Sequence, residues 1–317
     1  MSDIPPALSV IDLKKTYKIS KNKTFEALKG VSLHIPTGEF FGFLGPNGAG
    51  KTSLISIVSG LSVKTSGEVK IHGVSIDDDV DRAKSYLGLV PQEFNFNWFE
   101  TVENIVVNQA GYYGIPRDAA KIRTHELLKQ LELWDKRDVQ SMKLSGGMKR
   151  RLMIARALVH NPKVLLLDEP TAGVDVELRR GMWKFLKELN ESGTTIILTT
   201  HYLEEAEHLC KRVAIISGGT IIQEGTVKEL LATISQVTLL LDTKEVPSEA
   251  ALHLLRDLRI SKTQDEKTLE LILHQGETVN DAIRKMSTQG IEILNVRNEG
   301  SRLEEVFVRL IETKSLC

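Results

Sequence analysis

The chain of 317 residues is long enough for about two domains, because a single hydrophobic core rarely grows beyond roughly 250–300 residues. Its 41% hydrophobic and 26% charged residues are ordinary for a globular protein and exclude a chain that is disordered throughout. The formal net charge of −1 argues against a broadly basic surface, so we expect no nucleic-acid partner.

The cysteine content and the N-terminal sequence predict a protein of the cytosol. The two cysteines, Cys210 and Cys317, form neither a disulfide framework nor a metal-ligand pattern, which suits a reducing compartment. The N-terminal stretch MSDIPPALSV lacks the basic and apolar regions of a signal peptide. No run approaches 18 consecutive apolar residues, so we expect no membrane span. If the protein acts at a membrane, another chain must supply the span.

The first two thirds of the chain alternate between strand and helix patterns. Strands are predicted at residues 8–13, 31–38, 39–45 and 67–73, with a helix at 51–61. Residues 101–133 are predicted to be rich in helix, with breaks at Gly111 and at 114–116, and a further helix is predicted at 148–160. Continuous apolar runs at 163–170 and 194–201 predict strands that are covered on both faces. Buried strands that alternate with helices predict an α/β fold with a parallel sheet.

A new series of elements begins near residue 234. We expect a strand at 237–242, a helix at 247–257, strands at 258–262 and 267–273, a helix at 277–289, a strand at 291–296 and a last helix at 302–313. The order strand–helix–strand–strand–helix–strand is that of a ferredoxin-like fold. The prediction is therefore a first domain at 1–233 and a small α+β domain at 234–317. The last helix carries an apolar stripe, expected to pack on its own sheet or on the first domain, of Leu303, Val306, Phe307, Leu310 and Ile311.

The segment GPNGAGKT at 45–52 matches the pattern G-x-x-x-x-G-K-[ST] of a phosphate-binding loop. Its context fits, because an apolar strand precedes it and a helix follows. Glycines let backbone N–H groups turn toward phosphate oxygens, and the helix N-terminus favours an anion. Lys51 is expected to contact the β- and γ-phosphates, and Thr52 to ligate Mg²⁺. The predicted nucleotide-binding residues of this loop are Gly45, Pro46, Asn47, Gly48, Ala49, Gly50, Lys51, Thr52 and Ser53.

Two further segments supply groups for phosphate chemistry. VLLLDE ends a predicted buried strand with Asp168, expected to hold Mg²⁺, and Glu169, placed to polarise a water molecule in line with the γ-phosphate. The structural alternative is a salt-bridged strand end. LSGGMKRR at 144–151 predicts a helix start with Ser145 as N-cap. The exposed N–H groups of that helix start could also receive a phosphate from a second molecule.

These segments and their order along the chain resemble those of the ATPase subunits of ABC transporters, over about residues 7–233. The resemblance implies a P-loop NTPase fold with a helical subdomain. The resemblance identifies GPNGAGKT as Walker A, VLLLDEP as Walker B and LSGGM as the signature. It also identifies the Q-loop glutamine as Gln92 in VPQE, the D-loop aspartate as Asp175 in AGVD and the switch histidine as His201 in LTTH. Tyr17 matches the aromatic residue that this family stacks on adenine. Met148 replaces the usual glutamine of the signature, which puts one side-chain contact in doubt.

The resemblance implies that two such chains close head to tail on two molecules of ATP, with Mg²⁺ as cofactor. The ATP held by one chain's Walker A loop would contact the other chain's signature residues, Ser145, Gly146 and Gly147. Asp175 is also expected to bind the nucleotide. Glu169 would act as the base in hydrolysis, with His201 on the γ-phosphate. Gln92 would sense Mg²⁺ and the attacking water.

The chain is similar to the ATPase subunits of the type-2 exporter class, and the uncharacterised bacterial YadG type is the closest resemblance. The features that carry this similarity are the layout of the segments, the stretch TTHYLEEAE and the closing stretch SRLEEVFVRLI. This implies a polytopic membrane permease as partner and a cytoplasmic location, peripheral on the inner face of the cytoplasmic membrane. The alternatives are an importer ATPase, a soluble ABC ATPase that acts on ribosomes or DNA, and a regulatory module that binds ATP without turnover. A small-molecule sensor in the C-terminal domain is also open.

The stretch EFNFNWFE at 93–100 holds four of the 17 aromatic residues of the chain and follows Gln92 directly. In an extended backbone, Phe94, Phe96 and Trp98 would share one face. In the family that the chain resembles, this position meets a coupling helix of the membrane subunit. We therefore expect one or two of the four rings, which include Phe99, to be buried and the others to face a partner.

Overall fold

The computed structural model describes residues 5–21, 23–171, 174–232, 236–274, 276–298, 303–304, 306–308 and 310. The chain divides into two compact units, Met1–Gly225 and Thr226–Cys317, which are described separately. The predicted domain boundary between residues 233 and 234 lies outside the described residues and stays a prediction.

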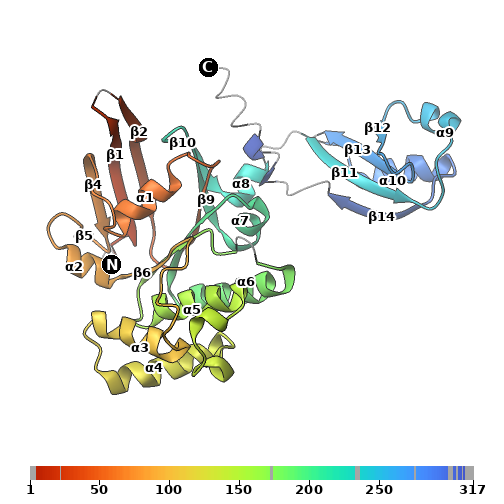
Figure 1. Cartoon of the computed structure of the whole chain (residues 1–317). Helices are drawn as coiled ribbons and strands as arrows, with labels where there is room; N and C mark the ends of the chain where they lie inside the picture. Colours follow the sequence, from red (N-terminus) through yellow and green to blue (C-terminus); the bar gives the residue numbers. More distant parts are fainter. Residues whose placement is uncertain are drawn as a thin grey trace. The chain divides into compact units, whose positions relative to one another are not determined.

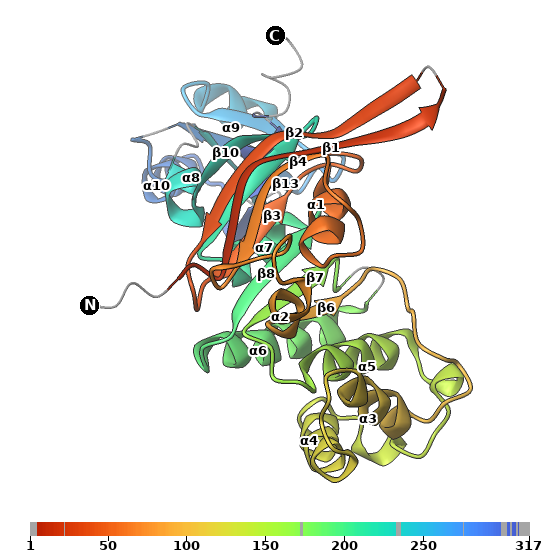
Figure 2. The same cartoon turned by 90° about the vertical axis from the view of Figure 1, so that its left-hand side faces the viewer.

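A six-stranded sheet forms the centre of the first unit, with the strand order β10–β9–β3–β8–β7–β6 (Figure 1 and Figure 2). Its strands are β3 (Phe40–Leu44), β6 (Leu87–Val90), β7 (Val164–Asp168), β8 (Thr195–Thr200), β9 (Arg212–Ser217) and β10 (Thr220–Thr226). β3 pairs in parallel with β8 and β9, and β7 pairs in parallel with β6 and β8. Every residue of β3, β7 and β8 is buried, as expected for strands covered on both faces. The predicted parallel α/β sheet is confirmed.

A second, antiparallel sheet has the order β2–β1–β4–β5. Its strands are β1 (Leu8–Ser20), β2 (Lys23–Ile35), β4 (Ser66–Ile71) and β5 (Val74–Ser75). Side chains of both sheets and of helix α1 (Lys51–Val58) form one hydrophobic core, which includes Phe41, Leu54 and Val69. The pairing of β1 with β4 ends at Lys14, while its pairing with β2 continues to Ser20. The far half of this hairpin therefore extends as a two-stranded ribbon (Figure 2).

A helical subdomain lies on one side of the central sheet (Figure 1). It contains α3 (Val102–Tyr112), α4 (Arg117–Gln130), α5 (Gly146–Leu158) and the short 3₁₀ turns η1 (Trp134–Lys136) and η2 (Ser141–Lys143). The predicted break at residues 114–116 is confirmed, and Gly114 has a φ of 72° there. The predicted break at Gly111 is wrong, because that residue is still inside α3. A glycine costs a helix only about 1 kcal/mol, which the packing of α3 outweighs.

Three further helices of the first unit had not been predicted. They are α2 (Val80–Ser85), α6 (Val176–Glu191) and α7 (Leu203–Leu209). In the described part of the chain, no helix combines the length and the apolar character that crossing a membrane requires.

The second unit begins with α8 (Val227–Ala232) and then has the predicted order of elements. These are β11 (Gln236–Thr243), α9 (Glu249–Leu254), β12 (Arg259–Lys262), β13 (Thr268–His274), α10 (Val279–Thr288) and β14 (Ile293–Asn298). The strands form an antiparallel sheet of order β12–β13–β11–β14, so that one strand separates the two strands of each strand–helix–strand segment. Leu241, Leu271 and Met286 belong to its core. The described residues of the predicted last helix are helical, with Leu303 and Val306 buried, and Ile311 lies outside the described residues.

Candidate active site

Four neighbouring parallel strands end at the predicted site. The loops after β3, β8, β7 and β6 carry, in that spatial order, the phosphate loop, His201, the pair Asp168–Glu169 and Gln92. Because β8 lies between β3 and β7, His201 emerges between the phosphate loop and the acidic pair. The carboxyl edge of an open parallel sheet is where such folds bind ligands. Strand order thus gathers residues that are far apart in the sequence.

The phosphate loop has the backbone that its glycines allow. Gly48 and Gly50 have φ values of 79° and 116°, in the left-handed region that favours glycine. A Cβ atom at Gly45 would lie 2.5 Å from the carbonyl oxygen of Ile216, so no larger residue fits there. Asn47 and Gly48 are exposed at the loop tip. No side chain caps the start of α1, which leaves the first N–H groups of that helix available to an anion.

Lys51 holds the loop from within. Its ammonium group donates hydrogen bonds to the carbonyl oxygens of Gly45, at 2.6 Å, and Pro46, at 3.2 Å. Burial lowers the pKa of Lys51, while Glu169 and Asp168 oppose that shift by attraction. An ammonium group has three donors, so one remains for a phosphate oxygen. The loop therefore fits a nucleotide phosphate chain.

The acidic pair at the end of β7 is almost entirely buried, with Asp168 5% and Glu169 7% exposed. Asp168 accepts a hydrogen bond from the Thr199 hydroxyl, and burial nevertheless raises the pKa of Asp168. Glu169 has a φ of 49°, an uncommon conformation for a residue with a side chain. Its backbone N–H donates to the carbonyl oxygen of Thr199 at 2.9 Å, which fixes the residue on β8.

The three residues expected to be catalytic meet at Glu169. Gln92 donates from Nε2 to Glu169 Oε2 at 3.1 Å, and His201 Nδ1 lies 2.9 Å from Glu169 Oε1. Both oxygens of the carboxylate are thereby held, each by a residue from a different strand end. His201 keeps 39% of its side chain exposed, so it also faces solvent. The carboxylate is thus oriented while its neighbours remain accessible.

The residues expected to ligate Mg²⁺ are an alcohol, an amide and one carboxylate. Thr52 lies in the first turn of α1 and is exposed, and Asp168 ends β7. Among the described residues, no group of three or more His, Cys, Asp or Glu side chains could hold a metal. Mg²⁺ in phosphate-binding sites uses one or two carboxylates together with waters and substrate oxygens. The donor set of Thr52, Gln92 and Asp168 is of this kind.

Tyr17 lies on the ribbon formed by β1 and β2. Its hydroxyl donates to Ser53 Oγ at 3.3 Å, beside the end of the phosphate loop, and its side chain is exposed enough to contact a ligand. The ammonium group of Lys15 lies 4.6 Å from the centre of the Tyr17 ring. The contact of Tyr17 with adenine stays a prediction.

The signature residues lie apart from the cluster around Glu169, at the start of α5. Ser145 caps this helix by accepting a hydrogen bond from the Met148 N–H at 3.3 Å, as the sequence predicted. Ser145 and Gly146 are exposed. A Cβ atom at Gly147 would lie 2.4 Å from a methyl group of Leu178.

The D-loop aspartate also caps a helix. Asp175 accepts a hydrogen bond from the Leu178 N–H at 3.0 Å and thereby caps α6. The signature and the D-loop therefore meet at Leu178. Ala172 and Gly173, which precede Asp175 in the D-loop, lie outside the described residues.

The aromatic stretch after Gln92 is divided between core and surface. Phe96 is buried, Phe94 is half-buried, and Trp98 and Phe99 are 40% and 72% exposed. The expected burial of one or two rings is confirmed, and contact of the others with a partner stays a prediction. The stretch forms no regular strand, yet the rings of Phe94, Phe96 and Trp98 form a cluster with centroids 5.5–6.4 Å apart.

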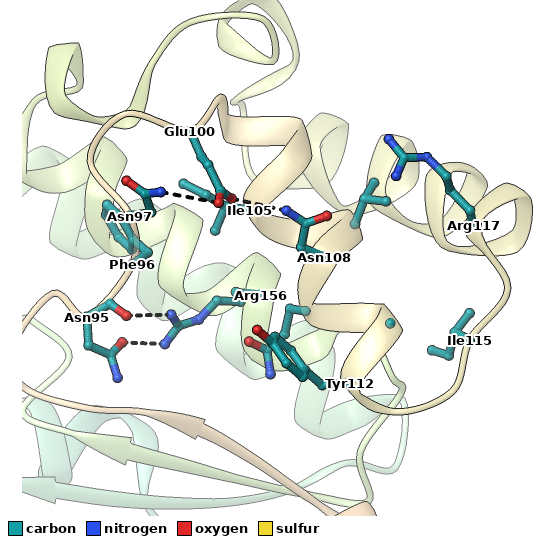
Figure 3. A pocket seen from close by; sticks show the side chains of 13 residues that line it. Asn95, Phe96, Asn97, Glu100, Ile105, Asn108, Tyr112, Ile115, Arg117 and Arg156 are labelled. Carbon is teal, nitrogen blue, oxygen red and sulfur yellow. Dashed lines mark hydrogen bonds between the residues drawn. The ribbon is translucent and has the colours of Figure 1, made fainter.

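A pocket of about 560 Å³ lies beside this stretch, among side chains of α3, α5 and residues 95–100 (Figure 3). Glu100 accepts hydrogen bonds from the amide groups of Asn97, at 3.3 Å, and Asn108, at 3.1 Å. Arg156 donates to both the backbone carbonyl and the side chain of Asn95. The pocket thus contains an acidic group and a basic group, and its aromatic lining residues are Phe96 and the exposed Tyr112.

Three residues near the site had not been predicted. Thr199 binds Asp168, and Arg150 binds the backbone at Gln92. Glu205 is fully buried behind the site and accepts a hydrogen bond from Trp183 Nε1 at 3.2 Å. No local sequence pattern marks them, because their partners are distant along the chain.

Glu205→Gln is expected to raise the thermal midpoint increasingly as pH rises from 5 to 8. Burial raises the pKa of Glu205, so the stability of the native protein is greatest below the ordinary carboxyl pKa and falls as pH rises through the raised value. Glutamine does not ionise, so the stability of the variant does not fall in this way as pH rises. The gain at pH 8 should be on the order of a few °C. Thermal unfolding of both proteins across this pH range tests it, with the exposed Glu204→Gln as control. A constant difference at all pH values would contradict the prediction.

Comparisons with known proteins agree with this geometry. The family model described as ABC transporter matches residues 28–172. The linearmycin resistance ATP-binding protein LnrL of Bacillus subtilis is 35% identical over 308 residues, which cover 96% of this chain and 97% of that protein. The Nod factor export ATP-binding protein I of Burkholderia thailandensis is 36% identical over 307 residues and covers the same shares.

A solved structure has the same fold as the first unit. It is the dimeric, post-hydrolysis ATP-binding cassette MJ0796 with ADP and Pi, which is 32% identical and has a TM-score of 0.64. The similarity covers 69% of this chain and 98% of that one. With a phosphate loop, a buried acidic pair, a glutamine and a histidine at one sheet edge, the chain belongs to the ATP-binding, ATP-hydrolysing proteins of ABC transporters.

Proposed function

We propose that this protein hydrolyses ATP to drive export through a separate membrane permease. The observation that carries the proposal is the carboxylate of Glu169, held by Gln92 and His201 at the sheet edge that ends in the phosphate loop. The names of both full-length relatives, for Nod factor export and linearmycin resistance, support export. An importer ATPase and a soluble ATPase on ribosomes or DNA remain the alternatives that experiment must exclude.

In the proposed mechanism, Lys51 and the N–H groups of the phosphate loop bind the phosphates of ATP. Glu169 accepts a proton from the water that attacks in line with the γ-phosphate. Gln92 and His201 orient the carboxylate of Glu169, and His201 donates to the γ-phosphate in the transition state. Thr52, Gln92 and Asp168 would hold Mg²⁺, which supplies neutralisation of the phosphate charge.

The working unit is proposed to be a head-to-tail dimer that forms on ATP. Ser145, Gly146, Gly147 and Asp175 would complete the site of the other chain. Their position at two helix starts outside the Glu169 cluster supports this, and the similar cassette MJ0796 is described as dimeric.

We further propose a polytopic permease of the type-2 exporter class as partner, with the YadG type as the nearest kind. The protein would then lie in the cytoplasm, on the inner face of the membrane. Residues 1–233 would form the ATPase domain and 234–317 a separate C-terminal domain.

The proposed contact with the permease is a docking surface made of Trp98, Phe99 and the pocket that is lined by the residues flanking them in the sequence, Asn97 and Glu100. A helix that carries apolar side chains and a cation would fit, because Glu100 lies in this pocket bound only by neutral amides among the bonds described above. Phe96 is only 8% exposed and lines the wall of this pocket, so its main role is expected to be packing.

Trp98→Ala with Phe99→Ala is expected to abolish binding of the permease and to leave ATP binding unchanged. Two exposed aromatic anchors commonly contribute 2 kcal/mol or more each to an interface, so affinity should fall about 100-fold or more. The measurement is recovery of a polytopic membrane protein with the tagged chain from detergent-solubilised membranes. Tyr112→Ala, which removes another exposed ring at the pocket, tells whether the surface extends along α3. Undiminished permease binding in the double variant would refute the docking surface.

The same preparation tests the function itself. Recovery of a polytopic membrane protein, with ATPase activity that Glu169→Gln abolishes, would support the transporter subunit. Recovery of ribosomes or DNA with the active chain would overturn it in favour of a soluble ABC ATPase.

A further inference from the structure

Helix α5 carries a buried arginine that forms hydrogen bonds with the backbone of the Q-loop. Arg150 donates from one guanidinium nitrogen to the carbonyl oxygen of Pro91 and from another to that of Gln92, both at 2.9 Å. It is only 4% exposed. A guanidinium group is planar and rigid, so two bonds to consecutive carbonyls fix the orientation of that backbone.

The same helix holds the residues that follow. The Arg150 guanidinium lies 5.2 Å from the centre of the Phe94 ring, and Lys149 lies 4.6 Å from that of Trp98. One turn and a half further along α5, Arg156 binds Asn95 (Figure 3). Three cations on one helix thus attach residues 91–98 to it, and a shift of α5 would carry this segment with it.

The attachment leads directly to the catalytic carboxylate. Gln92, whose backbone Arg150 holds, donates its side-chain amide to Glu169. At the start of α5, Ser145 caps the helix, five residues before Arg150. A continuous series of contacts therefore joins the signature to Glu169 within one chain.

We propose that Arg150 is a positioning residue that sets Gln92 against Glu169 according to the position of α5. In a head-to-tail dimer, contact of Ser145 with the ATP on the partner would then adjust the catalytic carboxylate beside the chain's own ATP. This inference rests on the proposed roles of Gln92, Glu169 and the signature.

The test compares Arg150→Met with Arg151→Met. Arg151 is the next residue of α5, with a side chain 14% exposed, and it binds Glu132 at 2.6 Å instead of the Q-loop. Arg150→Met should lower kcat for ATP hydrolysis about tenfold or more, with KM for ATP changed less than about threefold. Arg151→Met should leave both values within about threefold of the parent protein.

A double-mutant cycle with Gln92→Ala separates positioning from a general structural role. If Arg150 acts through the Gln92 side chain, Arg150→Met should cause no further loss of kcat in the Gln92→Ala background. An equal loss in both backgrounds, or no loss in either, would overturn the inference. If Arg150→Met does not fold, Arg150→Lys, which keeps the charge but cannot make both bonds, takes its place in the cycle. Undiminished hydrolysis by Glu169→Gln in the same assay would instead indicate failure of the proposed catalytic site.

Discussion

Glu169→Gln should reduce ATP hydrolysis about 100-fold or more while leaving ATP affinity unchanged. Glutamine has the same size and keeps an oxygen that can accept a hydrogen bond, but it cannot take a proton from water. Loss of a positioned general base typically costs a factor of about 10²–10⁴. The left-handed φ of 49° is no harder for glutamine than for glutamate, so folding should be preserved. Phosphate release and binding of a fluorescent ATP analogue measure the two effects separately.

The control for this variant is Glu204→Gln, which changes an exposed carboxylate of α7, three residues after His201. It should keep the activity of the parent protein. Glu169→Gln should also accumulate as an ATP-dependent dimer in size-exclusion chromatography, because slow hydrolysis prevents release. Activity like that of the parent protein would refute Glu169 as the base. An ATP-bound variant that stays monomeric would refute the proposed head-to-tail dimer for the isolated chain.

Lys51→Met is expected to weaken ATP binding about 100-fold. Lys51 is 6% exposed, and its ammonium group bonds to carbonyl oxygens of the phosphate loop, where burial strengthens its attraction to phosphate. A hydrogen bond to a charged group contributes about 1.5–3 kcal/mol, and the loss of charge neutralisation adds to it. Isothermal titration with ATP and Mg²⁺ measures the change.

Lys64→Met is the matched control, because Lys64 is a lysine with 17% side-chain exposure whose ammonium pairs with Asp77 at 3.1 Å. Its ATP affinity should equal that of the parent protein. The thermal midpoint of Lys51→Met should remain close to that of the parent, because burial of the Lys51 charge, which lowers its pKa, carries a desolvation cost that methionine avoids. ATP binding by Lys51→Met at full affinity would exclude this loop as the phosphate site.

The strands predicted from uninterrupted apolar runs are buried along their whole length, but β9, which is buried from Val213 to Ile216, was missed. β3, β7 and β8 are buried at every residue, so uninterrupted apolar runs mark them. α6 has 16 residues and was missed although its sequence carries a helical period, with Leu178, Met182, Leu186 and Leu189 at intervals of three or four residues. β10 is half-buried along most of its length and β6 has four residues, so neither strand stands out.

The residues of the site also differ in how far along the chain their partners lie, and this decided which of them could be predicted. The phosphate loop and the two helix caps, Ser145 and Asp175, depend on residues within a few positions of one another, and local sequence was enough to predict them. Arg150 and Thr199 bind partners 58 and 31 residues away, which only the order of the strands and the approach of α5 bring near. The local sequence pattern therefore could not predict these contacts.

The left-handed backbone of Glu169 has a consequence for engineering. Such a conformation costs a residue with a side chain roughly 1–2 kcal/mol, and glycine is free of that penalty. A laboratory selection for heat resistance alone would therefore be expected to enrich glycine or asparagine at position 169 and to yield sturdier proteins that no longer turn over ATP. Any stability screen of this protein needs a simultaneous demand for hydrolysis.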